Sequence, residues 1–214
     1  MTDCLLAAML DDVGAGTYLP PDGSVTIVPQ PSARDAGVID FPAHAVIFTD
    51  ADPDWVRDQL QAGDLSAPLS PRFLQLLGDR TGRRASSIDM LCMAGSLPGR
   101  PAVVLAPETG AGHPRIARAL GCRDDVRAWQ ADGGVLLLGR GVAGRWEVAI
   151  EVDQDRRRAG LGRALATAAR HLVPDGAALW AQIAPANAAS VRAFLAAGFI
   201  PVGAEALLTA GPSE

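Results

Sequence analysis

The residues whose types and spacing best suit the binding of a ligand lie around position 160. Three consecutive arginines occupy residues 156–158, and Gly160, Gly162 and Arg163 follow them. Guanidinium groups carry fixed positive charge, and glycines let an anion approach the main chain closely. The pattern therefore predicts a site for a pyrophosphate or another phosphorylated ligand.

Two glutamates in the preceding segment are candidates for proton transfer. Glu147 and Glu151 alternate with Val148, Ile150 and Val152, so in a strand the two carboxylates share the face opposite the apolar residues. A general base must come within hydrogen-bond reach of the proton that it removes. Either glutamate could serve as a base, acting through water, or could be a solvated surface residue.

A strand, a turn and a helix must position these groups. The strand expected at 146–152 runs into the arginine-rich turn, after which Leu161, Leu165 and Leu172 recur at helical spacing. A helix that begins there directs backbone N–H groups and the positive end of its dipole at the turn. Residues 160–165 lack the G-x-G-x-x-G pattern of a dinucleotide fold and the lysine of a P-loop.

The rest of the chain predicts a mixed α/β protein. The β-branched and apolar runs and the capping signals predict strands at 24–28, 45–49, 87–94, 126–130, 134–139, 146–152 and 179–183, helices at 54–60, 70–78, 113–120 and 161–172, and a hairpin turn at 140–145. Residues 95–101 are rich in Gly and Pro, the strongest linker signal in the chain. We therefore expect a smaller N-terminal α/β region at 1–98 and a second domain at 99–214.

Two ordered motifs resemble the GNAT superfamily of acetyl-CoA-dependent N-acetyltransferases. Residues 157–162 match R/Q-x-x-G-x-G/A, the pyrophosphate loop of that family, after a strand that ends near Val152. Residues 179–183 look like its fifth strand. Asn187, Ser190, Phe194, Gly198 and Phe199 then follow at the spacing of its N-x-x-(A/S)-x-x-x-Y-x-x-x-G-F helix. The resemblance covers residues 126–208 and implies a GNAT-like fold in the C-terminal half.

The resemblance also implies a binding role for each matching residue. Acetyl-CoA would insert its pantetheine arm between the strands that contain Val152 and Trp180, pairing with main-chain groups near Ile150 to Val152. Asn187 would bond the pantetheine or cap the following helix, and Phe194 would lie beside the thioester. The implied cofactor-binding residues are Ile150, Val152, Arg157, Arg158, Ala159, Gly160, Leu161, Gly162, Arg163, Asn187, Ser190 and Phe194.

The sequence departs from the family pattern where proton transfer would occur. The helix position that is commonly Tyr, the general acid for the departing thiolate, is Phe194, and phenylalanine carries no acidic proton. A fifth-strand carboxylate of some relatives corresponds to Gln182, and the fourth-strand base of others falls at Trp146, beside Glu147. Two functions stay open: acetyl transfer to a primary amine of a small molecule or peptide by direct attack, or a catalytically weak acyl-CoA-binding sensor or interaction module. A third hypothesis is that the glycine turn binds a different phosphorylated ligand.

Composition and charge argue against several other classes of protein function. The 214 residues are 49% hydrophobic and 20% charged, as in globular proteins, and the formal charge of −5 is poorly suited to broad nucleic-acid binding. The basic charge is concentrated in the second half: residues 1–98 sum to −7 and residues 99–214 to +2. All nineteen basic residues are arginine, which leaves no lysine for a Schiff base.

Several further residues have structural readings. Cys4, Cys92 and Cys122 form no C-x-x-C pair, and no metal site is expected. His44 could be a base but is more often structural in such a setting, and Asp50, Asp52, Asp54 and Asp58 could attract a cationic amine but are expected mainly in turns and helix caps. Trp55 and Phe73 are expected in the core.

The chain also gives expectations on location and partners. The start, Met1 to Leu5, lacks the basic n-region of a signal peptide, and the apolar stretches are shorter than the roughly 20 residues of a membrane span. We expect a cytoplasmic monomer or homodimer that binds neither nucleic acid nor membrane.

Overall fold

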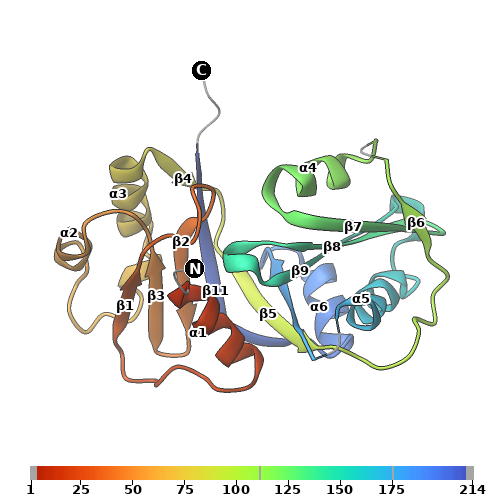
Figure 1. Ribbon diagram of the computed structural model, residues 1–214, viewed down its shortest axis with the longest axis horizontal. Coiled ribbons are helices and arrows are strands. Elements are labelled where there is room, and N and C mark those ends of the chain that lie inside the picture. The colour runs from red at the N-terminus through yellow and green to blue at the C-terminus, as the bar shows by residue number, and fades with distance from the viewer. Residues whose placement is uncertain (1–3, 111, 175, 211–214) are drawn as a thin grey trace. The chain divides into compact units, whose positions relative to one another are not determined.

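The computed structural model describes residues 4–110, 112–174 and 176–210 (Figure 1). Residues 1–3, which contribute to the expectation of a cytoplasmic protein, lie outside them. The chain divides into unit 1, Met1–Leu91 with Val202–Glu214, and unit 2, Cys92–Pro201. The chain passes from unit 1 to unit 2 within β5 (Asp89–Gly95) and returns within β11 (Ile200–Ala210).

Unit 1 contains a mixed sheet. Its strands are β1 (Val25–Val28), β2 (Ala36–Phe41), β3 (His44–Phe48), β4 (Arg83–Ala85) and the greater part of β11. β1 lies parallel to β3, while β2 pairs antiparallel with both β3 and β11. β4 pairs antiparallel with the end of β11, from Leu208 opposite Ala85 to Ala210 opposite Arg83.

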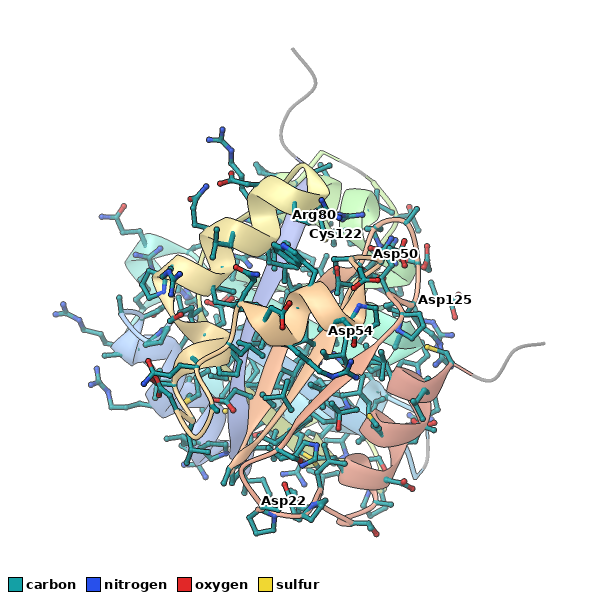
Figure 2. All side chains as sticks on the ribbon, turned by 90° about the vertical axis from the view of Figure 1, so that its left-hand side faces the viewer. Asp22, Asp50, Asp54, Arg80, Cys122 and Asp125 are labelled. Carbon is teal, nitrogen blue, oxygen red and sulfur yellow. The ribbon has the colours of Figure 1, made fainter. Side chains whose placement is uncertain are left out.

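Two helices cover one face of this sheet. α2 (Pro53–Asp58) and α3 (Pro71–Thr81) enclose a core around Val38, Ile47 and Phe73, and their near side appears in Figure 2 with Asp54 and Arg80 labelled. Ser70 caps α3 by accepting a hydrogen bond from the N–H of Phe73 at 3.2 Å. A third helix, α1 (Leu5–Gly14), buries Leu6, Leu10 and Val13.

Unit 2 is built on a six-strand order, β5-β10-β9-β8-β7-β6. The strands after β5 are β6 (Ala106–Glu108), β7 (Asp124–Ala131), β8 (Gly134–Arg140), β9 (Trp146–Val152) and β10 (Ala178–Ile183). β6 to β9 are antiparallel neighbours, and β8 pairs with β9 along its whole length. β10 lies parallel to β9.

Helices cover both faces of this second sheet. α4 (Pro114–Cys122) packs through Ile116 and Ala119 on Val135 and Leu137, with Ala149 of β9 beside them. α5 (Leu161–Leu172) and α6 (Ala188–Ala196) lie together on the opposite side, as Figure 1 shows. The alternation of side chains along β9 therefore directs Glu147, Ala149 and Glu151 toward α4.

Most expected elements are present, with shifted ends. The prediction of a mixed α/β fold is confirmed, and α5 spans the predicted 161–172. The sequence reading did not find α1, whose N-cap Cys4 makes no capping hydrogen bond, or β2, whose Gly37 allows close approach to the carbonyl of Ala206. Part of the predicted linker is tied to α5: Leu97 N–H donates to Arg170 O, and Arg170 Nε donates to Gly95 O.

Candidate functional site

The candidate site begins where β9 and β10 separate. Their parallel pairing joins Leu179 to Trp146 and Trp180 to Glu147. Beyond these pairs, the described remainders of the two strands are not paired with each other, although β9 remains paired with β8 as far as Val152. The part of β9 that contains Ile150 and Val152 is therefore unpaired on the side of β10 and open to an extended ligand, although the carbonyl oxygen of Val152 accepts a hydrogen bond from Arg157.

A turn with left-handed backbone geometry connects the open end of β9 to α5. A single 3-10 turn, Gln154–Arg156, follows the strand, and Arg158 then adopts φ 65°. Gly160 has φ 85° and immediately precedes α5. A Cβ at Gly160 would meet nothing within 4 Å, so its backbone conformation, and not crowding, favours glycine there.

The turn, the end of β9 and α6 meet at Gly162. A Cβ at this position would lie 3.5 Å from Cβ of Ala193 and 3.8 Å from Cγ2 of Val152. At the start of α6, Asn187 accepts a hydrogen bond from the N–H of Ser190 at 3.1 Å. The helix-cap alternative for Asn187 is thereby confirmed, and the structure brings both sequence motifs to one place.

The four arginines of the turn differ in how they are held. Arg156 pairs with Asp132 at 2.5 Å, and Arg157 Nε donates to the carbonyl oxygen of Val152 at 3.2 Å. Arg158 and Arg163 are exposed and make no hydrogen bond or ion pair with the described residues. Two cations beside the start of α5 are therefore free to bind an anion. Ala159 is exposed beside them, and Leu161 is half-buried as the first residue of α5.

Phe194 packs inside unit 2. Only 4% of its surface is exposed, and its ring meets that of Phe199 edge to face at a centroid distance of 4.9 Å. An apolar ring suits this position, because a buried hydroxyl there would need a hydrogen-bond partner.

Glu147 is held in a buried cluster with two arginines. Its carboxylate pairs with Arg123 Nε and Arg145 Nε at 2.9 Å each and accepts from the N–H of Val142 at 3.3 Å. A Cβ at Gly141 would overlap the carboxylate, so the backbone encloses it closely. Burial by itself raises the pKa of Glu147, but the charges and hydrogen bonds of Arg145 and Arg123 hold that pKa below its ordinary value. A carboxylate engaged in this way is a poor proton acceptor.

Glu151 lies on the same face of β9 in a different environment. Its side chain is 43% exposed and accepts a hydrogen bond from Arg115 Nε of α4 at 2.7 Å. That hydrogen bond and the charge of Arg115, with smaller contributions from His113 and Arg157, lower the pKa of Glu151 despite partial burial. Of the two glutamates, only Glu151 is accessible to a ligand.

The arginines around the two glutamates were not singled out from the sequence. Arg115 and Arg123 come from α4 and the residue after it, more than twenty positions before β9, and no local pattern connects them to it. Arg145 is two positions before Glu147, so strand alternation could have placed the two side chains on one face.

Candidates in unit 1 have structural roles. His44 is buried, with Nε2 2.8 Å from Oγ1 of Thr26 and Nδ1 3.1 Å from the carbonyl oxygen of Pro20. Asp52 caps α2 by accepting from the N–H groups of Asp54 and Trp55. Asp50 and Asp54 are exposed near this helix (Figure 2). Within the described ranges, no three His, Cys, Asp or Glu side chains are grouped as metal ligands, and no helix is long and apolar enough to cross a membrane.

The part of the chain that holds the site is similar to a known family. Residues 126–199 match the model of the acetyltransferase (GNAT) family. This range contains β9, the turn, α5, β10 and α6. Over these residues, about a third of its length, the chain is therefore similar to GNAT-family acetyltransferases. A search of curated proteins returned no match.

Three solved structures illustrate the relatives of the fold. A GCN5-related N-acetyltransferase from Kribbella flavida aligns with 20% identity and a TM-score of 0.44 over 66% of this chain and 64% of its own. A putative GNAT-family acetyltransferase from Novosphingobium aromaticivorans aligns with 15% identity and a TM-score of 0.44, over 62% and 69%. A tandem GNAT protein from the clavulanic acid biosynthesis pathway aligns with 16% identity and a TM-score of 0.42, over 84% and 65%. The chain thus spans less than two thirds of the first and third of these proteins.

Proposed function

We propose that this protein transfers an acetyl group from acetyl-CoA to a primary amine. The observation that carries the proposal is the separation of β9 from β10 after Trp146 and Glu147, directly beside the glycine turn that begins α5. An open strand edge and an anion-binding helix start, joined by eight residues, suit an extended ligand with a pyrophosphate at one end.

The residues of the turn would bind the donor. Main-chain N–H groups from Arg157 to Arg163 would hold the pyrophosphate, and the free guanidinium groups of Arg158 and Arg163 would add charge-assisted hydrogen bonds. The main chain of Ile150 and Val152 would pair with the pantetheine arm. Phe194 of α6 would pack near the thioester, and Ser190, in the first turn of the same helix, would also lie beside the donor.

The transfer would be a direct displacement. The amine nitrogen attacks the thioester carbon, an N–H of β9 near Val152 stabilises the developing oxyanion, and the C–S bond breaks with its electron pair on sulfur. The proton released from nitrogen passes to solvent, either directly or through Glu151. Coenzyme A leaves as a thiolate, for which a dedicated acid is not obligatory.

The test combines ligand-induced stability with turnover. Acetyl-CoA at about 100 times its dissociation constant should stabilise the native state by roughly 2.7 kcal/mol, seen as a rise in melting temperature that NAD and ATP do not produce. Coenzyme A release in the presence of an amine panel then measures transfer. A rise in melting temperature without release by any amine would favour the alternative, a catalytically weak acyl-CoA-binding sensor or interaction module.

A matched pair of variants tests the turn. Gly160 and Gly144 both have positive φ, 85° and 78°, and a Cβ at either meets nothing within 4 Å. Gly160→Leu and Gly144→Leu should therefore strain the backbone alike, but only Gly160→Leu places its side chain where the pyrophosphate would bind. Loss of the acetyl-CoA effect in Gly160→Leu alone supports the assignment, and retention in both variants contradicts it.

A further inference from the structure

The Arg115–Glu151 pair joins α4 to the open stretch of β9. The two side chains meet at 2.7 Å while remaining 40% and 43% exposed, respectively. The hydrogen bond from Arg115 engages Oε2 of Glu151, and among the described residues no side-chain hydrogen bond is found at its other carboxylate oxygen. The pair therefore presents a cation and an anion, side by side, to solvent.

This pair lies on a definite face of β9. Val152 approaches Gly162 of α5, whereas Ala149 packs with Ile116 of α4. Glu151 shares the face of Ala149, and its backbone lies between Ile150 and Val152. A thioester held by the main chain of those two residues would thus have the Arg115–Glu151 pair next to it, on the side away from α5.

A pair of this kind fits a ligand that carries both charges. A solvent-exposed ion pair contributes little to folding stability, so its two partners can be re-engaged by a ligand at small cost. Glu151 can accept hydrogen bonds from an ammonium group, and the planar guanidinium of Arg115 can bind a carboxylate in a bidentate manner. An amine without a carboxylate would form hydrogen bonds with Glu151 but would offer Arg115 no anion to replace it.

We propose that the acceptor is a zwitterion, a small molecule that carries its amine and a carboxylate on neighbouring carbons, as an α-amino acid does. The inference rests on the proposed function and names the substrate class of the same site. Arg115 binds the carboxylate and Glu151 orients the amine. The ammonium group gives one proton to solvent, and the free amine attacks the thioester carbon to form the N–C bond. The nitrogen then loses its second proton to solvent, directly or through Glu151, as the C–S bond breaks with release of coenzyme A thiolate.

The experiment compares acceptors that differ only in the carboxylate. Release of coenzyme A is measured with leucine, leucinamide and isoamylamine, and with the corresponding compounds of the tyrosine and glutamate series. We expect kcat/KM for the amino acid to exceed that of its amide and its decarboxylated amine by about tenfold or more in at least one series, mainly through a lower KM.

Two arginine variants connect this preference to the pair. Arg115→Gln should reduce the ratio of amino acid to amide to near one by raising KM. Arg118→Gln is the control, because Arg118 is exposed on the same helix and does not contact Glu151. An equal preference in wild type and Arg115→Gln, or a preference of the wild type for the amide or the amine, overturns the proposal.

Failure of the proposed function has a different signature. If no amine of any series stimulates coenzyme A release, acyl transfer itself is excluded, and the zwitterion inference is excluded with it. If amines are acetylated without regard to the carboxylate, the proposed function stands and only the inference fails.

Discussion

The two ends of β9 hold the same residue type in opposite states. Glu147 is 3% exposed and bound by two arginines, and Glu151, four residues on and on the same face, is half-exposed with one arginine partner. The difference follows from what surrounds each carboxylate: Arg123, Arg145 and the backbone at Gly141 enclose Glu147, whereas Glu151 has Arg115 beside it. Backbone pairing changes over the same stretch, because β10 pairs with β9 at Glu147 and not at Glu151. One strand thus combines a closed, structural end with an open end that can bind a ligand.

The two carboxylates have different roles. The buried cluster holds the turn at Gly141 and the start of β9 in place, because Glu147 also accepts the N–H of Val142. The open end carries the main-chain groups and the Arg115–Glu151 pair that a donor and an acceptor would use. The catalytic role of either glutamate stays a prediction, and the geometry favours Glu151.

The largest expected loss of folding stability comes from a substitution at Glu147, at the closed end of β9. Glu147→Gln would leave Arg123 and Arg145 without their anion in the interior, and we expect it to lower the free energy of unfolding by about 3–5 kcal/mol. Urea unfolding at pH 7 measures this. A change below about 1 kcal/mol would show that the arginines find other partners and that the cluster does not support β9.

Acid should reduce the difference in stability between wild type and Glu147→Gln. The pKa of Glu147 is lowered from 4.5, so its stabilisation is complete above about pH 4.5 and disappears as the pH falls through the lowered folded-state pKa. The stability gap between wild type and Glu147→Gln should therefore be constant near neutrality and shrink below pH 4.5. Unfolding curves of both proteins across pH 3–7 test the sign, and a gap that widens in acid contradicts it.

Two glycines at the open end should respond in opposite directions. Gly160→Ala places a side chain at φ 85° and should cost about 1–2 kcal/mol. Gly162→Ala, inside α5 with only ordinary contacts to Ala193 and Val152, should stabilise by about 0.5 kcal/mol. Thermal unfolding of both variants without ligand measures this, and equal destabilisation would mean that the turn differs from the one described.

The smallest expected effect is at Glu151. Glu151→Gln removes an exposed ion pair and should change the free energy of unfolding by no more than about 0.5 kcal/mol. The variant should nevertheless raise KM for the amine acceptor if Glu151 orients it. Urea unfolding alongside acceptor kinetics separates the two roles, and a loss of several kcal/mol would place Glu151 with Glu147 as a structural residue.

Local sequence signals determined much of this protein. The periodicity of residues 161–172 predicted α5, the alternation of residues 146–152 predicted β9, and the capping roles of Ser70, Asp52 and Asn187 were readable because each depends on groups within three residues. The glycine turn and its family resemblance followed from contiguous residues for the same reason.

Only the tertiary structure decided how the two glutamates differ. Strand alternation placed Glu147 and Glu151 on one face, but the burial of Glu147 depends on the turn at Gly141, which packs against its carboxylate. The charge pairing of the two glutamates depends on Arg115 and Arg123, which are distant in sequence. α1 and β2 were missed for a related reason: they are stabilised by burial of Leu6, Leu10 and Val13 and by close packing at Gly37, and local propensity carries neither signal. Long-range contacts decide burial, and burial decides which of two identical side chains is available for chemistry.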